Sequence, residues 1–398
     1  MTLLSPAVAF FVTVSVIAFI LYSKFSRLVQ DVPNERSLHS NTVPRTGGIG
    51  LVIGVFAGWG LMLGALPWWL WLPCALLFAV SLLDDIRNLP VWQRLLAHLL
   101  AATLLVSGSG IPAQYGFLTA IALFLIAAWM IDLYNFMDGS DGLAGGMALF
   151  GFAGYGVAAL LAQDQVLGLV CLTITASAAG FLLFNFHPAK IFLGDAGSIP
   201  LGFLAAALGI WGWLRGDWTL WFPLLVFSPF IVDATVTLCK RTLRGAKITE
   251  AHREHYYQRA IQLGAGHRPV ALIEYGLMAI AGVAAVRVRM QDWPWQVLLT
   301  AGVVYGALML ILDRRWKTQG RVSARSIARL RCKCEAVGMA RMACFTANFC
   351  AQCASSSSLP CTLMPFRMHP DLRVSSSRKP TTRHSLLRTN SFERPTPA

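Results

Sequence analysis

Residues 117–146 read FLTAIALFLIAAWMIDLYNFMDGSDGLAGG, and this stretch decides the fold class. Its first half is an apolar run long enough to cross a bilayer as one helix. Its second half places Asp132, Asp138 and Asp141 at and just beyond the end of that run. Ionisable residues at membrane depth are costly and are functional-site candidates by default. The stretch therefore predicts a spanning helix that brings carboxylates to one face of a membrane.

The same pattern recurs along most of the chain. The 398 residues are 56% hydrophobic and only 13% charged, whereas a soluble domain typically carries about 25% charged residues. We therefore expect an all-α, polytopic membrane protein with about eleven spanning helices. The expected helices are residues 3–22, 47–65, 68–83, 95–111, 117–133, 143–161, 166–184, 197–213, 219–238, 269–288 and 294–312.

The charge of the connecting loops predicts the orientation. Lys and Arg concentrate in the cytoplasmic loops of membrane proteins. The connections on one side of the threaded helices hold 14 Lys and Arg, and those on the other side hold three. We therefore expect a periplasmic N-terminus and a cytoplasmic C-terminus. Residues 1–22 lack a basic segment before the apolar run, so they are expected to be an anchor and not a cleaved signal peptide.

Carboxylates gather on the side predicted to be cytoplasmic. Asp84 and Asp85 end one apolar run, Asp195 precedes another, and Asp233 lies near the end of a third. With the three aspartates of the opening stretch they predict one acidic, cation-binding site. Carboxylate and amide oxygens suit Mg²⁺, which usually also binds substrate phosphates. A solvated helix end at the Asp pair and a capped polar turn at 132–146 are the alternatives.

Basic residues lie on the same side. His252, Arg253 and His255 follow several Lys and Arg, and two His at i and i+3 of a helix share a face. These groups, with Lys190, are predicted to contact phosphate oxygens; zinc binding and attraction of anionic lipid are the alternatives. Arg45 lies in the first loop, and the Gly47-Gly48 pair after it is expected to bring backbone close to a ligand.

Together these motifs resemble those of the polyprenyl-phosphate N-acetylhexosamine-1-phosphate transferases of glycosyltransferase family 4, which are related to the phospho-MurNAc-pentapeptide transferases. The resemblance covers about residues 30–312. It is carried by five motifs in order, namely the Arg36–Gly48 loop, Leu83-Asp84-Asp85, Asn135-Phe136-Met137-Asp138-Gly139-Ser140-Asp141-Gly142, Phe192-Leu193-Gly194-Asp195-Ala196-Gly197-Ser198 and the loop with His252 and His255.

The resemblance implies roles for individual residues. Asp84 and Asp85 match an acidic pair that deprotonates or positions a lipid phosphate. Asn135 and Asp195 match Mg²⁺ ligands, with Mn²⁺ as an alternative ion. The remaining implied positions are Asp138 and Asp141 at the nucleotide site, Phe192 stacking on uracil, His252 and His255 with Arg253 at the diphosphate, and Arg45 and Lys190 beside it.

The implied reaction transfers a sugar 1-phosphate from a UDP-N-acetylhexosamine to undecaprenyl phosphate and releases UMP. Direct displacement and a covalent Asp intermediate both fit. The peptidoglycan branch has three consecutive histidines where this chain has His252-Arg253-Glu254-His255, and Lys where it has Asn88. This sequence more closely resembles the O-antigen-initiating branch. That resemblance implies that the transferred sugar is a 6-deoxy sugar such as FucNAc or QuiNAc, or GlcNAc. The implied location is the bacterial inner membrane, with the site facing the cytoplasm and homodimerisation left open.

Residues 313–398 differ from the rest of the chain. They hold 16 Lys and Arg against 4 Asp and Glu, so they carry most of the formal net charge of +14. The excess therefore belongs to a tail, and no nucleic-acid partner is expected. We expect two segments: a transmembrane transferase domain over 1–312, and a basic, Ser- and Cys-rich tail that is disordered or reflects a change of reading frame. A zinc knuckle at its Cys pairs is the alternative.

Two further classes of protein are compatible with a polytopic chain. A transporter or lipid flippase places carboxylates near mid-membrane on broken helices and often shows repeats. Here the carboxylates lie at helix ends and no repeat is visible. A scaffold with a degenerate site is the third hypothesis, and the intact acidic set argues against it.

Overall fold

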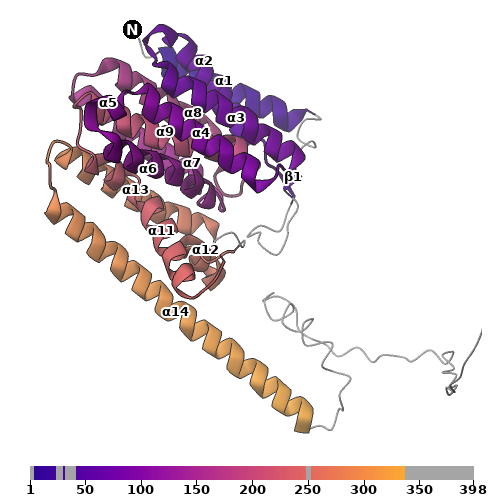
Figure 1. The fold of residues 1–398 in the computed structure, drawn as a ribbon. Coiled ribbons are helices and arrows are strands. Elements are labelled where there is room, and N and C mark those ends of the chain that lie inside the picture. The colour runs from indigo at the N-terminus through magenta and orange to yellow at the C-terminus, as the bar shows by residue number, and fades with distance from the viewer. Residues whose placement is uncertain (1–3, 24–29, 32–41, 248–251, 337–398) are drawn as a thin grey trace, which may run out of the picture. The chain divides into compact units, whose positions relative to one another are not determined.

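The computed structural model describes residues 4–23, 30–31, 42–247 and 252–336, and side chains of the last helix only as far as Gln319. It divides into two compact units, of which the first runs from Met1 to Ile327. The helices of this unit are drawn in Figure 1. Arg36, with which the first motif begins, and the tail beyond residue 336 lie outside the described residues.

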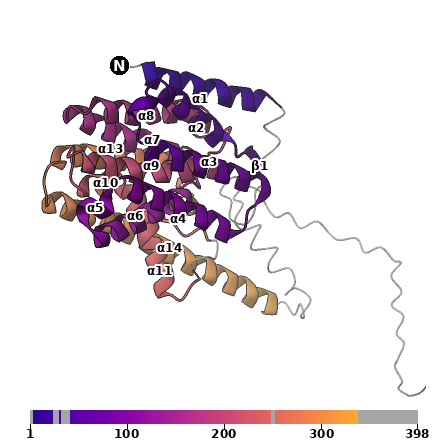
Figure 2. The same ribbon diagram turned by 45° about the horizontal axis from the view of Figure 1, so that its top comes forward.

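The described chain is helical apart from one two-residue antiparallel ladder, in which Gln30 pairs with Pro44 and Asp31 with Val43. Figures 1 and 2 both show β1 beside one end of α3. The elements are α1 (Leu4–Tyr22), β1 (Gln30–Asp31), β2 (Val43–Pro44), α2 (Gly47–Gly60), a 3₁₀ turn η2 (Leu63–Ala65), α3 (Trp68–Arg87), α4 (Val91–Gly108), α5 (Ile111–Tyr115), α6 (Phe117–Phe136), α7 (Leu143–Leu161), α8 (Gln165–Asn185), α9 (Asp195–Leu214), α10 (Trp221–Val226), α11 (Ser228–Leu243), α12 (Tyr256–Ala260), a π turn η3 (Ile261–Ala265), α13 (His267–Val288) and α14 (Trp295–Ala336).

The all-α membrane fold is confirmed. Each of the eleven expected ranges overlaps a helix. Within the described residues, nine helices are long and apolar enough to span a membrane, and α2 is a shorter apolar helix. The expected helix at 219–238 is divided into α10 and α11 at Phe227, because Pro229 has no N–H and is suited to the first turn of a new helix.

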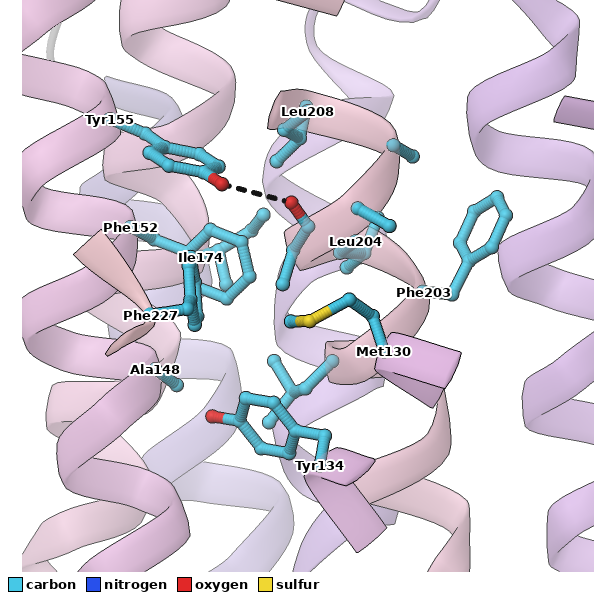
Figure 3. Close-up of a cluster of buried hydrophobic side chains, with 14 of the residues drawn as sticks. Met130, Tyr134, Ala148, Phe152, Tyr155, Ile174, Phe203, Leu204, Leu208 and Phe227 are labelled. Carbon is cyan, nitrogen blue, oxygen red and sulfur yellow. Dashed lines mark hydrogen bonds between the residues drawn. The ribbon is translucent and has the colours of Figure 1, made fainter. Parts of the chain in front are cut away.

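The core lies around α9. In the apolar stretch of α9, 89% of the residues are buried, whereas the corresponding share in α1 is 28%. Figure 3 shows the aromatic and aliphatic side chains that pack between α6, α7, α8 and α9, including Phe152 and Phe227. The Tyr155 hydroxyl donates to the Ala205 carbonyl at 3.0 Å, and the Tyr134 hydroxyl donates to the Ala144 carbonyl at 2.7 Å. Both buried phenols are therefore satisfied, and they tie α7 to α9 and α6 to α7.

The helix ends alternate between two sides, as the threading predicts. On one side the ends of α3, α6, α8 and α11 meet the starts of α2, α4, α7, α9 and α13. On the other side Arg215 after α9 contacts Asp164 before α8, and the Thr219 N–H donates to the Arg289 carbonyl at 2.9 Å. All the motif residues lie at the first side.

The expected boundary at 312/313 falls inside α14, which continues to Ala336. Asp313 contacts Lys240 and Arg259 through its side chain. The first unit therefore includes residues that the sequence assigned to the tail.

Candidate active site

The first residues of α9 contact the carboxylate at the end of α3. The Asp195 N–H donates to Asp85 Oδ1 at 3.3 Å and the Ala196 N–H to Asp85 Oδ2 at 2.9 Å. The first N–H groups of a helix lack internal partners and form its positive end. The Asp85 carboxylate, whose side chain is 3% exposed, therefore caps α9 from the end of α3.

Gly194 allows this close approach. It lies before α9 with φ +72°, and a Cβ there would stand 2.6 Å from the Arg45 carbonyl oxygen and 3.1 Å from Asp85 Oδ2. Only glycine adopts this conformation without strain and leaves that space. The Gly-Asp sequence therefore joins the Arg45 segment, the end of α3 and the start of α9 at one point.

Two arginines connect the carboxylates. Arg94 Nη1 lies 2.9 Å from Asp84 Oδ2 and 3.4 Å from Asp195 Oδ2. Arg45 Nη2 lies 3.1 Å from Asp195 Oδ1 and 3.7 Å from Asp85 Oδ1. Both arginine side chains are about a third exposed, with 34% for Arg94 and 37% for Arg45, whereas the three carboxylates are nearly buried. We call Asp84, Asp85, Asp195, Arg45 and Arg94 the acidic cluster.

Asp138 faces this cluster from the loop after α6. Its carboxyl pKa is raised to about 7, chiefly because burial withdraws it from water. The charges of Asp195 and Asp85 add to the increase, whereas Arg45 opposes it. The charges of the acidic cluster therefore act on a fourth carboxyl group, and this group can gain or lose a proton near neutral pH.

Asn135 is held beside the same helix start. The Ser198 hydroxyl donates to Asn135 Oδ1 at 2.7 Å and also contacts the Gly194 carbonyl at 3.1 Å. Ser198 and Asp195 are three residues apart on α9, so they share a face. The structure therefore brings the two expected metal ligands, Asn135 and Asp195, to one face of α9.

The donor set of this region fits Mg²⁺. Among the described residues, no group of three or more His, Cys, Asp or Glu side chains is arranged to hold a metal by itself. Mg²⁺ usually takes one or two carboxylates and completes its shell with water and substrate phosphate. The region contains the four carboxyl groups of the acidic cluster and Asp138, and the amide oxygen of Asn135. Two guanidinium groups, of Arg45 and Arg94, face these oxygens, so hard oxygen ligands are in excess. Asn135 and Asp195 fit as its protein ligands.

Asp141 belongs to a separate group on the same side. His187 Nδ1 lies 2.6 Å from Asp141 Oδ2, and His267 Nδ1 lies 4.0 Å from Asp141 Oδ1. The two imidazole rings are stacked with centroids 5.6 Å apart. Asn185 Oδ1 accepts from the Gly142 N–H at 3.0 Å. This group links α7, α8 and α13, and the sequence patterns gave no role to its members Asn185, His187 and His267.

The loop with His252 and His255 packs beside the end of α6. The Tyr257 hydroxyl donates to the Phe136 carbonyl at 3.3 Å, and the His255 ring stacks on the Phe136 ring at 6.4 Å. The two His rings lie 4.9 Å apart. The expected shared helix face is wrong, because α12 begins only at Tyr256 and His255 precedes it. The conformation of the loop, and not helical periodicity, brings the His252 and His255 rings together.

Carboxylates anchor this loop. Asp233 accepts hydrogen bonds from the Tyr256 and Tyr257 N–H groups at 2.8 and 3.0 Å. Asp313 lies 2.6 Å from Lys240 Nζ and 2.9 Å from Arg259 Nη1. Asp233 is therefore a support of the His loop, and it does not join the acidic cluster.

Arginines at the end of α11 and in α12 surround Glu254. Its carboxylate lies 2.5 Å from Arg241, 2.6 Å from Arg244 and 3.5 Å from Arg259. These charges hold the pKa of Glu254 below its usual value, against the opposing effect of burial. Three arginines around one glutamate form a dense, positively charged lobe at the end of α11.

The remaining predicted residues take less specific positions. Phe192 is half-buried, and its backbone pairs with Pro44 and Gly47 at 2.8 Å. The side chains of Lys190 and Arg253 are exposed. Burial and the neighbouring His255 lower the pKa of His252 to about 4, so its imidazole is neutral at pH 7.

The seven aspartates therefore do not form one site, although all lie on one side. Asp132 pairs with His98 Nδ1 at 2.8 Å between α4 and α6. Asp141 and Asp233 have the partners described above. Desolvation explains the separation of Asp141 and Asp233, because these nearly buried carboxylates each require their own donors.

A comparison with protein families relates part of the chain to a known family. The model of glycosyl transferase family 4 matches residues 67–213, which include α3 to α9 and the whole acidic cluster except Arg45. Over these residues the chain is similar to glycosyl transferase family 4. The His loop lies outside the matched residues of the family 4 model.

The chain is also similar to proteins that are named as sugar-phosphate transferases. It is 29% identical over 273 residues to the probable undecaprenyl-phosphate N-acetylglucosaminyl 1-phosphate transferase of Bacillus subtilis, covering 64% of this chain and 76% of that protein. It is 26% identical to the phospho-N-acetylmuramoyl-pentapeptide-transferase of Listeria welshimeri, with 70% and 95% covered. It is also 26% identical to the decaprenyl-phosphate N-acetylglucosaminephosphotransferase of Mycobacterium tuberculosis, with 70% and 79% covered.

Proposed function

We propose that this multi-pass membrane protein transfers an N-acetylhexosamine 1-phosphate from a UDP-sugar to a polyprenyl phosphate, releasing UMP. The observation that supports the proposal is the acidic cluster, in which Arg94 and Arg45 join three nearly buried carboxylates at the ends of membrane helices. The relatives act on undecaprenyl or decaprenyl phosphate. We take undecaprenyl phosphate as the acceptor and the bacterial inner membrane as the location, with the cluster facing the cytoplasm.

In the proposed reaction an oxygen of the lipid phosphate attacks the β-phosphorus of the UDP-sugar. A new P–O bond forms to the lipid while the bond between the β-phosphorus and the bridging oxygen breaks, and that oxygen leaves with UMP. Mg²⁺ held by Asn135 and Asp195 would neutralise charge that develops on the diphosphate. The acceptor and donor both carry negative charge, so groups that reduce their repulsion are essential.

The chain's own residues divide these tasks. Arg94 and Arg45 offer forked N–H donors suited to phosphate oxygens. Asp84, Asp85 and Asp138 are the candidate groups for positioning or deprotonating the lipid phosphate. Asp138 fits proton transfer best, because its pKa of about 7 is close to the working pH.

The loop side binds the donor in this proposal. His252, His255 and the positive lobe around Glu254 lie beside the end of α6, so they are suited to the diphosphate. Phe192 is proposed to stack on the uracil ring, and Asp141 to help shape the nucleotide site. We assign Lys190 and Arg253, which are exposed, to the rim of the site.

For the sugar we propose an N-acetylhexosamine of the GlcNAc type, with the 6-deoxy sugars FucNAc and QuiNAc as specific candidates. The His252-Arg253-Glu254-His255 sequence supports this choice over phospho-MurNAc-pentapeptide. We further propose that the product initiates O-antigen or a related surface polysaccharide.

Mass spectrometry of the lipid product tests the proposal. Purified protein is incubated with undecaprenyl phosphate, Mg²⁺ and each UDP-sugar in turn. An undecaprenyl-diphosphate-linked hexosamine, formed from UDP-GlcNAc or a 6-deoxy donor and not from UDP-MurNAc-pentapeptide, is the expected result. Absence of any lipid-linked product from folded protein with every donor would overturn the transferase assignment.

A further inference from the structure

A second polar site lies at the opposite side of the helices from the acidic cluster. The turn between α7 and α8 and the turn between α9 and α10 line a cavity of about 400 Å³ that is open to the surface. It is lined by Ala162, Gln163, Asp164, Arg215 and Asp217. None of these residues has a role in the proposed transfer reaction.

Two buried carboxylates line this cavity. Asp164 and Asp217 are each 6% exposed. Asp164 Oδ1 accepts from the Leu167 N–H at 3.0 Å and so caps α8, while its Oδ2 forms an ion pair with Arg215 Nε. Asp217 Oδ2, like Asp164 Oδ2, is buried and accepts no hydrogen bond from an N–H donor among the described residues, and the two carboxyl side chains are in hydrogen-bonding contact with each other. A buried acceptor without a donor is costly, so this oxygen indicates a missing partner.

The charges point to a cationic partner. Two carboxylates face one guanidinium group, which leaves one negative charge uncompensated. Burial raises the pKa of Asp217 to about 6, the charge of Asp164 and a side-chain hydrogen bond to Asp164 add to the increase, and Arg215 opposes it. At neutral pH the carboxylate is still mainly ionised, and a positively charged N–H donor would satisfy both its charge and its unused lone pairs.

The surroundings place the cavity at the level of lipid headgroups. Tryptophan concentrates at membrane–water interfaces. Several tryptophans belong to the helix ends on this side, and the rings of Trp221 and Trp293 lie 4.8 Å apart. The others are Trp213 and Trp295. Half of the Arg215 side chain is exposed, and Arg carries N–H donors beyond the Nε that pairs with Asp164.

We propose that this cavity binds the headgroup of a phospholipid with a primary ammonium group, that is, a phosphoethanolamine lipid. The ammonium donates to Asp217 Oδ2, and the phosphate accepts from the outer guanidinium N–H groups of Arg215. A cavity of about 400 Å³ is much larger than a bare metal ion requires, since a water molecule occupies only about 30 Å³ in the liquid. The adjacent acidic and basic groups match the two ends of a zwitterion.

Lipid binding by the full-length protein tests the proposal. Native mass spectrometry measures retention of phosphatidylethanolamine, phosphatidylcholine and phosphatidylglycerol on wild-type protein in detergent, with and without Ca²⁺. Phosphatidylcholine has the same phosphate, but its ammonium has no N–H. We expect phosphatidylethanolamine to be retained about tenfold more strongly, which is the effect of one charge-assisted hydrogen bond. Asp217→Asn should remove this preference, whereas Asp292→Asn, an exposed carboxylate on the same side, should keep it.

Other results would overturn the proposal. Equal retention of the two zwitterionic lipids by wild-type protein excludes ammonium recognition, and this comparison needs no variant to fold. A preference that survives in Asp217→Asn removes Asp217 from the site. Stabilisation by Ca²⁺ in place of lipid would make the cavity a metal site. UMP release should be unchanged in Asp217→Asn, so the outcome is independent of the proposed transferase activity.

Discussion

Arg94 provides the most informative perturbation of the acidic cluster. A single nitrogen of its guanidinium group contacts both Asp84 and Asp195, at 2.9 and 3.4 Å. In Arg94→Ala these two nearly buried carboxylates lose their shared counter-charge. They would then repel each other and also the negatively charged substrates.

The magnitude follows from burial. Removing one partner of a buried ion pair costs about 3–5 kcal/mol, whereas an exposed pair typically contributes less than about 1 kcal/mol. The Arg94 side chain is 34% exposed, so we expect an intermediate cost of about 2 kcal/mol. Expressed in the transition state, this lowers kcat/KM about 30-fold. Arg94→Lys keeps the charge but not the planar fork, so its loss should be smaller.

The assay is UMP release by purified protein with undecaprenyl phosphate and a UDP-sugar, with thermal unfolding measured on the same samples. Arg87→Ala is the matched control, since Arg87 is exposed at the end of α3. If folded Arg94→Ala protein keeps activity within threefold of wild type, the contacts of Arg94 with Asp84 and Asp195 do not support catalysis. An equal loss in Arg87→Ala would also refute this role of Arg94.

Three further predictions concern the cap, the His loop and α14. Asp85→Asn weakens the cap of α9 and should cost about 1 kcal/mol of unfolding free energy, measured by thermal unfolding; an unchanged midpoint contradicts it. The pKa of His252 is lowered to about 4, so the unfolded chain binds more protons between that value and about 6.5. Stability should therefore fall as pH drops through this window, and His252→Gln should lose that dependence; identical midpoint–pH curves would contradict this. Asp313→Ala removes the shared partner of two cations and should raise KM for the UDP-sugar, whereas truncation after residue 320 should leave activity intact; the opposite pattern would assign activity to the tail.

The fold was predictable because apolar run length determines spanning helices. The deviations have local causes that hydropathy averages out. Residues 47–65 form a shorter helix that ends at Gly60, with a 3₁₀ turn and Pro67 after it. Residues 219–238 divide at Phe227, and the last helix continues to Ala336 although its second half is polar.

The acidic residues of the site were predictable, but their partners were not. Asp84, Asp85 and Asp195 stand out because carboxylates at the ends of apolar runs are costly. Arg94 is one of many basic residues near a helix end, and nothing in its spacing shows that α4 lies against α3 and α9. His187 likewise becomes visible only when α8 and α7 are packed.

Gly47 and Gly48 illustrate the same limit. The sequence predicted a close approach of backbone to a ligand. In the structure a Cβ at Gly48 would lie 2.3 Å from the Gly197 nitrogen, so the glycine permits contact between α2 and α9. Composition shows that space is needed, but only the fold shows what fills it.

UMP release is the most direct test of the proposed sugar-phosphate transfer to undecaprenyl phosphate. Purified protein is assayed with a UDP-N-acetylhexosamine, with and without undecaprenyl phosphate and with Mg²⁺ present or removed by chelation, beside Asp195→Asn and the exposed control Asp292→Asn. We predict release only when lipid and Mg²⁺ are both present, a loss of roughly 100-fold in Asp195→Asn, and full activity in Asp292→Asn. Release that persists without lipid or Mg²⁺, or undiminished release by Asp195→Asn, would contradict the account.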